Sequence, residues 1–304
     1  EAGWLAVGAM ANTLFVQTLD SKPLWEEKIT ENMEMYKEFC KDFVKEVQKL
    51  VQSKNPVHIY LGIKVIGNTG MFDFKDTLKD IVLQMRDVAI QREAIHAFSK
   101  IIKFRQSSTT DITRDVMHRR KLINEFNQIV EFLMEVFGNE INFDVEVRLT
   151  AYKVLIMGQP KKDLLSLIFE QAMNQNNEQL RRYVFTHLIQ MNWRKGACSW
   201  PIKWDIRSLL ASVRPLLERE IPLNYWRVYE LNFWCKYLQM GLSVGNDLIF
   251  GEDDAVWRSY DHRIDVHMFG RTFPLIEFGV SGGKLLGQQQ NRFLSKSEFW
   301  EKLK

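Results

Sequence analysis

The stretch PVHIYLGIKVIGNTG, residues 56–70, decides the fold class. Asn55 and Pro56 are typical of a helix start, and the apolar run that follows stops at the Gly-Asn-Thr-Gly of 67–70. Upstream, residues 33–51 place apolar side chains every three or four positions, with lysines and acidic residues on the other face. The two segments therefore predict a pair of antiparallel helices joined by a tight turn.

The same pattern of helix and break recurs as far as residue 192. Further helices are predicted over 74–85, 88–104, 122–137, 145–157, 162–174 and 178–192. Each pair has an apolar face that only its neighbours can bury, which is typical of an α-solenoid. The polar stretch Gln106–Asp111 interrupts the pattern and is predicted to be an exposed insertion loop.

Beyond residue 192 the composition changes. Tryptophan and proline gather in 193–246, which predicts an aromatic-rich, irregular helical end. After 247 the apolar period falls to two, with Ile264, Val266 and Met268 on one face of a predicted strand. A second strand is predicted from 273 to 280, and a short helix from 295 to 304. An isolated hairpin is only marginally stable, so these strands need further strands beside them.

The predicted fold class is therefore mostly α. An α-α superhelix of helix pairs over 1–192 is followed by the irregular end over 193–246. The start of an amphipathic β-sheet, with its short terminal helix, occupies 247–304. Residues 1–10 read as the inside of a helix, so a fragment of a longer chain is expected.

Composition excludes several classes of protein. With 46% hydrophobic and 26% charged residues the chain can bury a core, so large-scale disorder is not expected. Its net charge of +3 is spread along the chain, which argues against a nucleic-acid partner. Apolar runs fall short of the roughly 18 to 20 residues that cross a bilayer, so no membrane-spanning segment is predicted.

Catalytic and metal-binding patterns are also missing from the sequence. The six histidines lack metal-ligand spacing, and no Gly-x-Ser-x-Gly, His-Glu-x-x-His or Gly-x-Gly-x-x-Gly motif occurs. The chain is accordingly predicted to be no enzyme and to hold no cofactor or metal. The basic pairs at 161–162 and 181–182 could form a positive strip for a receptor or lipid phosphates, although ordinary solvated helix faces are favoured.

Four segments together resemble the large lipid transfer proteins, which include vitellogenins, apolipoprotein B, apolipophorin and the microsomal triglyceride transfer protein. They are WLAVGAM at 4–10, IYLGIKVIGNTG at 59–70, VEVRLTAY at 145–152 and RIDVHMFGRTFPLIE at 263–277. Their order agrees with the family, and the last segment looks closer to apolipophorin and apolipoprotein B than to yolk proteins. The family's cysteine after the first segment is absent here, which leaves the pairing of Cys40 open.

The resemblance implies a secreted, extracellular lipid carrier, with the ER lumen as the alternative location. Its helical horseshoe would brace a lipid cavity, and its partners would be phospholipid or neutral lipid, the rest of its own chain and a cell-surface receptor. The residues expected to contact lipid are Ile264, Val266, Met268, Phe273, Leu275, Ile276 and Phe278. Whether Phe273 and Leu275 or Ile276 and Phe278 continue the apolar face depends on register, which the sequence leaves open. The alternative function is a protein-binding α-solenoid scaffold of the HEAT or armadillo type.

Overall fold

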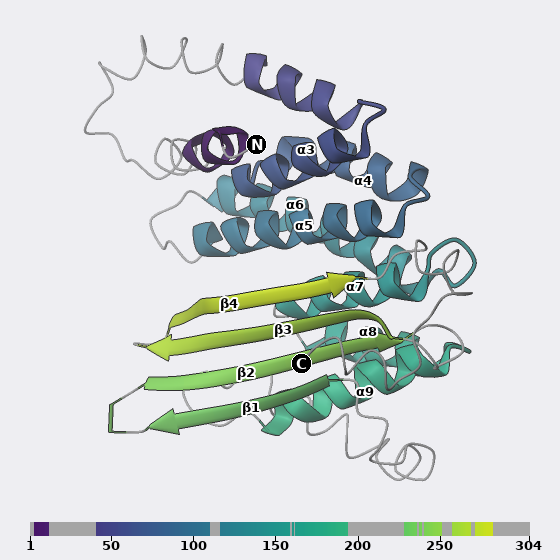
Figure 1. Cartoon of the computed structure of the whole chain (residues 1–304), viewed down its shortest axis with the longest axis vertical. Helices are drawn as coiled ribbons and strands as arrows, with labels where there is room; N and C mark the ends of the chain where they lie inside the picture. Colours follow the sequence, from purple (N-terminus) through teal and green to yellow (C-terminus); the bar gives the residue numbers. More distant parts are fainter. Residues whose placement is uncertain are drawn as a thin grey trace, which may run out of the picture. The chain divides into compact units, whose positions relative to one another are not determined.

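The fold is a set of paired helices followed by a small antiparallel sheet (Figure 1), as the computed structural model of the chain shows. The structure describes residues 3–11, 41–109, 116–158, 160, 162–193, 228–235, 237–238, 240–250, 257–268 and 271–281. Two compact units divide the chain, the first comprising Glu1–Gln171 and the second Ala172–Lys304. The prediction of a mostly α fold with paired helices and a β segment is confirmed.

Helices of the first unit pack as neighbours along the chain and as next neighbours, the arrangement of a solenoid. After the helices of residues 3–11 and 41–51 come α3 (Pro56–Thr69), α4 (Lys75–Gln84), α5 (Val88–Thr109), α6 (Val116–Gly138), α7 (Val145–Met157) and α8 (Lys162–Met173). Helix α5 packs on α3, α4 and α7, and α7 packs on α6 (Figure 1). Helices α5, α6 and α7 each pack against more than one other helix.

Local sequence signals start and stop these helices. The Asn55 side chain accepts a hydrogen bond from the Val57 N–H at 3.0 Å, and Pro56 occupies the first turn of α3. Gly70 ends that helix with φ 62°, a left-handed conformation that costs glycine little. At α7 the Asp144 side chain caps the N–H of Glu146 at 3.0 Å. The predicted bounds of α7 are confirmed at both ends.

The predicted loop at Gln106–Asp111 is wrong in its first part. Helix α5 continues to Thr109, and residues 110–115 lie outside the described part of the chain. The stretch contains neither glycine nor proline, and serine or threonine costs a helix only about 0.5 kcal/mol relative to alanine. A helix that already exists propagates through such residues. Helix α6 likewise begins at Val116, before the predicted start at 122.

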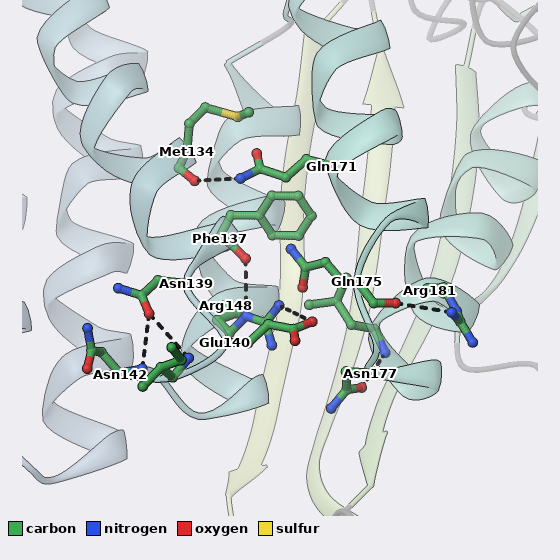
Figure 2. A network of polar contacts seen from close by, with 12 residues as sticks. Met134, Phe137, Asn139, Glu140, Asn142, Arg148, Gln171, Gln175, Asn177 and Arg181 are labelled. Carbon is green, nitrogen blue, oxygen red and sulfur yellow. Dashed lines mark hydrogen bonds and ion pairs between the residues drawn. The ribbon is translucent and has the colours of Figure 1, made fainter.

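Buried polar contacts tie α5, α6 and α7 together. Arg92 of α5 donates from Nη1 to Oε2 of Glu146 of α7 at 2.9 Å, and both side chains are largely buried. Arg148 donates from Nε to the carbonyl oxygen of Phe137 at 3.1 Å and pairs with Glu140 at 3.6 Å (Figure 2). The end of α6 is thus held to α7 by an arginine that satisfies the exposed carbonyl of its last turn.

The second unit combines a helix with a four-stranded sheet. Helix α9 (Glu178–Trp193) begins beside Asn177, whose side chain accepts from the Leu180 N–H at 2.9 Å (Figure 2). The strands are β1 (Val228–Cys235), β2 (Met240–Phe250), β3 (Trp257–Met268) and β4 (Arg271–Ser281), paired antiparallel in that order. Helix α9 contacts the sheet at β1.

Assignment of 193–246 to irregular helices is wrong for its last part. Strand β1 and most of β2 lie within it, so the expected hairpin of β3 and β4 is half of a larger sheet. This sheet supplies the neighbouring strands that the hairpin needs for stability. Residues 194–227 and the predicted helix at 295–304 lie outside the described residues, and the domain boundary at 192 stays a prediction.

Candidate functional site

The register of the four strands defines two faces of the sheet. Residues directly opposite one another in antiparallel strands point to the same side. The outer face comprises Leu231, Phe233, Cys235, Met240, Leu242, Val244, Asn246, Leu248, Tyr260, His262, Ile264, Val266, Met268, Ile276, Phe278 and Val280, and positions 271 (Arg271) and 273 (Phe273) register with it. The inner face comprises Val228, Ser243, Asp247, Ile249, Ser259, Asp261, Arg263, Asp265 and Gly279. One face is thus mainly apolar, and the other carries most of the charge.

Burial of the two faces runs opposite to that of a water-exposed sheet. On the outer face Phe233 is 61% exposed, Ile276 52% and Phe278 54%. On the inner face Ser243 and Ser259 are almost fully covered, at 2% and 0%. A sheet in water normally covers its apolar face and exposes its polar one. Within the second unit this sheet does the reverse.

Tyr183 of α9 lies close to charged residues of the inner face. Its side chain is fully buried, and the carboxylate of Asp247 interacts with it electrostatically. Burial raises the pKa of Tyr183 well above its usual range, and the carboxylates of Asp247 and Asp261 raise it further. Arg263 pairs through Nε with Asp265 at 2.9 Å. These charged and hydroxyl groups are the kind that must be paired when they are buried.

Gly279 makes room for one of these carboxylates. A Cβ at that position would lie 2.8 Å from Oδ1 of Asp261, the residue opposite it on β3. Any larger residue would push the carboxylate away from the edge of the inner face. The glycine at this position is therefore explained by packing.

A bulge decides the register that the sequence left open. Ile264 pairs with Ile276, whereas Asp265 pairs with Pro274, so Leu275 is the extra residue of β4. Pro274 cannot donate to the ladder, and proline in a sheet is found at edges and bulges. The sequence left open whether Phe273 and Leu275 or Ile276 and Phe278 continue the apolar face. Because the bulge shifts the alternation of side chains by one residue, one position from each pair, 273 and 276, registers with the outer face.

Of the residues expected to contact lipid, six have described side chains. Ile264, Val266 and Met268 are half-buried on the outer face, beside the more exposed Ile276 and Phe278. Leu275, the bulge residue, is also exposed. Position 273 registers opposite Val266, and its side chain lies outside the described residues.

The outer-face residues of β1 and β2 were not predicted from the sequence. They are Leu231, Phe233, Met240, Leu242 and Val244. A period-two alternation at 231–235 and 240–248 could have found them. This alternation directly follows the tryptophan- and proline-rich stretch, and the predicted helical segment was extended to residue 246, over β1 and most of β2.

Three polar residues interrupt the apolar pattern of the outer face. Tyr260 donates from its hydroxyl to Oδ1 of Asn246 at 2.6 Å, and Nδ1 of His262 lies 2.8 Å from the same oxygen. The rings of Tyr260 and His262 stack, with centroids 6.4 Å apart. We name Asn246, Tyr260 and His262 the polar row, since they lie side by side on β2 and β3.

Other candidate sites have weaker support. Arg182 is buried and pairs with Glu178, and Arg181 donates to the Gln175 carbonyl at 3.1 Å (Figure 2), so neither side chain is an unengaged surface cation. Among the described residues, no group of three or more His, Cys, Asp or Glu is placed to hold a metal. No described helix is long and apolar enough to cross a membrane.

Comparison with known protein families finds a match over the helical part of the chain. The model of the vitellogenin TPR domain family matches residues 1–189, well over half of the chain. The chain belongs to this family. Vitellogenin-family proteins are lipid carriers, generally non-enzymatic and typically secreted. The resemblance to the large lipid transfer proteins is thereby confirmed at the level of the family, while the branch within it stays a prediction.

A solved structure extends the likeness to the sheet. In a study of lipid–protein interactions in lipovitellin, one chain aligns with a TM-score of 0.56 over 79% of the present chain, at 16% sequence identity. At this identity the likeness concerns the fold. The alignment covers 24% of the lipovitellin chain, so this vitellogenin-family chain spans about a quarter of it. No curated protein matches by sequence.

Proposed function

We propose that this chain is part of a secreted lipid carrier and that the outer face of its sheet contacts the carried lipid. The observation that carries the proposal is the reversed burial of the sheet, with large apolar side chains exposed and serines covered. The helices would act as the brace of the lipid cavity. In this reading Ile264, Val266, Met268, Ile276 and Phe278, with Phe273 and Leu275 from the same strand, form part of the lipid-contacting surface.

Energetics favour an apolar partner for this face. Removing apolar surface from water is worth about 25 cal/mol per Å², whether lipid or protein covers it. A contiguous apolar patch rimmed by polar residues marks an interaction site. The inner face cannot exchange places with it, because that would expose Ile249 and break the contacts of Tyr183 and Asp247. The sheet therefore keeps its apolar side outward until something covers it.

Lipid is favoured over a protein partner because of the family and the continuity of the face. Two adjacent rows are apolar across all four strands, namely Leu231, Val244, Ile264 and Ile276, and then Phe233, Leu242, Val266 and Phe273. Arg271 registers opposite Met268 in the row that follows. A HEAT-type scaffold would bind its partner along the helices and would not need this surface. We further propose the apolipophorin or apolipoprotein B branch, because residues 263–277 look closer to that branch.

The test replaces Val266 and Met268 with Asp in the full-length carrier. Two carboxylates on the outer face should lower lipid per mole of protein, because a charge is costly to place against an apolar phase. Lipid would be measured after organic extraction of the natively purified protein, and helix content by circular dichroism. A carrier variant that folds normally and keeps wild-type lipid content would contradict the proposal.

A matched control introduces the same charges elsewhere. Ile141→Asp and Leu167→Asp alter apolar residues that are 94% and 52% exposed in the helical unit. This double variant should retain its lipid. Equal losses in both double variants would mean that added charge itself, and not its place on the sheet, controls lipid content. If the wild-type full-length protein yields no lipid at all, the scaffold function is favoured instead.

A further inference from the structure

The carboxylates of the described strands all register with one face of the sheet. Residues directly opposite one another share a side, so the register assigns each carboxylate to the inner face. They are Glu230, Asp247, Asp261, Asp265 and Glu277. His262 registers with the outer face, where these strands place no acidic residue. A positive charge on His262 would therefore find no counter-ion from the four strands on its own side of the sheet.

The side chains around His262 on the outer face are uncharged. Asn246 registers directly opposite it on β2, and Phe278 does so on β4. Tyr260 precedes it on the same face of β3, stacks on its ring and donates to Asn246. Among these described neighbours Tyr260 is the other titratable group, and its hydroxyl is engaged.

Charged groups of the second unit lie away from His262. The flanking Asp261 and Arg263 alternate to the inner face, and α9 brings Tyr183 to the carboxylates there. On the outer face Arg271 registers at the far end of the sheet, about 20 Å from His262 at about 3.3 Å per residue of strand. This distance exceeds the Debye length of about 8 Å at physiological ionic strength, so Arg271 has little influence on the charge of His262.

The polar row fixes the tautomer of the neutral histidine. Nδ1 of His262 lies 2.8 Å from Oδ1 of Asn246, which also accepts from the hydroxyl of Tyr260 at 2.6 Å. Because an amide oxygen can only accept, neutral His262 carries its proton on Nδ1 and has a bare acceptor at Nε2. Protonation keeps the contact with Asn246 and adds an N–H and a full positive charge to the ring. The ring is half-buried on the outer face, so this charge appears on the surface that lipid would cover.

A charged imidazole is much more costly than a neutral one beneath an apolar cover. In the lipid-free protein, water reaches the half-buried ring and solvates its charge. Lipid on the outer face would displace this water, and hydrocarbon supplies no compensating group. Binding of a proton at His262 and binding of lipid over it therefore oppose each other, and by linkage each weakens the other to the same extent.

From these observations, and on the basis of the proposed lipid-carrier function, we propose that His262 makes lipid binding by the outer face depend on pH. Neutral His262 is compatible with an apolar cover, whereas protonated His262 weakens the binding of that cover. Histidine is the side chain whose charge ordinarily changes between about pH 5 and 8. The sheet thus holds lipid more firmly at neutral pH than in acidic surroundings.

Lipid partition at two pH values tests the coupling. The full-length carrier would be loaded with radiolabelled triolein, which has no titratable group, and equilibrated with vesicles of zwitterionic phosphatidylcholine. We expect the partition coefficient of triolein between carrier and vesicles to be about tenfold lower at about pH 5 than at about pH 7.5. A tenfold change corresponds to roughly 1.4 kcal/mol. The variant His262→Gln should lose most of this pH dependence, because glutamine stays neutral at both pH values.

Two further variants separate the place of the charge from its chemistry. The matched control His58→Gln removes an exposed histidine of α3 and should keep the wild-type pH dependence. The variant His262→Arg is charged at both pH values, since arginine is not deprotonated in proteins. It should show the low partition coefficient of the acidic wild type at both pH values. Circular dichroism at each pH checks that the variants remain folded.

The outcomes distinguish this inference from the function on which it rests. If the wild-type carrier binds triolein but its partition coefficient stays constant with pH, or falls equally in His262→Gln, the proton coupling is wrong and the carrier function stands. A partition coefficient that rises at acidic pH, or a folded His262→Arg that behaves as neutral wild type, would also overturn the coupling. A wild-type carrier that binds no triolein at either pH would contradict the proposed function, and the inference with it.

Discussion

The helices and the sheet of this protein are built on opposite rules of burial. In the helical unit Ile63, Leu155 and Phe98 are covered, and the buried charges of Arg92 and Glu146 are paired with each other. In the sheet Ser243 and Ser259 are covered, whereas Phe233 and Ile276 are exposed. The helices satisfy the hydrophobic effect within the chain, and the sheet leaves much of its apolar area for a partner.

The difference shows that the two parts depend on different interactions. Truncation of a covered apolar side chain leaves a cavity, so the helices should be sensitive to it. The sheet is held by its ladders and by the polar contacts of its inner face, including those of Tyr183. Loss of an outer-face side chain should therefore alter binding far more than folding.

The largest effects are expected in the helices. Leu155, Ile168 and Leu188 are buried, and each change to Ala should lower the free energy of unfolding by about 2 to 5 kcal/mol. Denaturant unfolding followed by helical circular dichroism measures this. If all three changes cost less than about 0.5 kcal/mol, where ordinary surface substitutions fall, the contrast between helices and sheet would be wrong.

An intermediate effect is expected from the covered polar face of the sheet. Tyr183→Phe removes a buried hydroxyl that interacts electrostatically with the carboxylates of Asp247 and Asp261, and we expect a cost of about 1 kcal/mol near neutral pH. Urea unfolding monitors this loss. A cost near zero would mean that the contacts between α9 and the inner face contribute little to stability.

The same residue predicts a pH dependence. Because its pKa is raised in the folded state, the unfolded chain loses the Tyr183 proton first as the pH rises above about 10, and the folded chain keeps it. Stability from this group is therefore complete below about pH 10 and declines above it. The difference in free energy of unfolding between wild type and Tyr183→Phe should shrink as the pH rises. A control change to Phe at the exposed Tyr237 should leave the pH dependence of the free energy of unfolding as in wild type.

The smallest effect on stability is expected on the outer face. Phe233→Ser and Ile276→Ser each remove an exposed apolar side chain, so the free energy of unfolding without lipid should change by less than about 0.5 kcal/mol. Bound lipid should nevertheless fall, because the same side chains would lie against it. Losses above about 2 kcal/mol in the lipid-free protein would show that other parts of the chain cover this face.

Much of the helical part was predictable because its causes are local. The caps Asn55 and Asp144 and the left-handed Gly70 act on neighbouring backbone, and a repeated apolar stripe predicts which face is covered. Three of the four segments that carry the family resemblance lie in helices, and the fourth lies in β3 and β4. Prediction failed at Gln106–Thr109, where polar composition suggested a loop but nothing in the stretch breaks a helix.

For the sheet, the sequence by itself determined that residues 264–268 alternate and that their apolar face needs a cover. Only the tertiary structure decided that β1 and β2 extend this face, that Leu275 is a bulge, and that Asn246 meets His262 and Tyr260. The physical reason is that helical contacts lie within four residues of one another, while strand register depends on partners far along the chain. A shift of one residue in that register exchanges the two faces, and no local signal reports it.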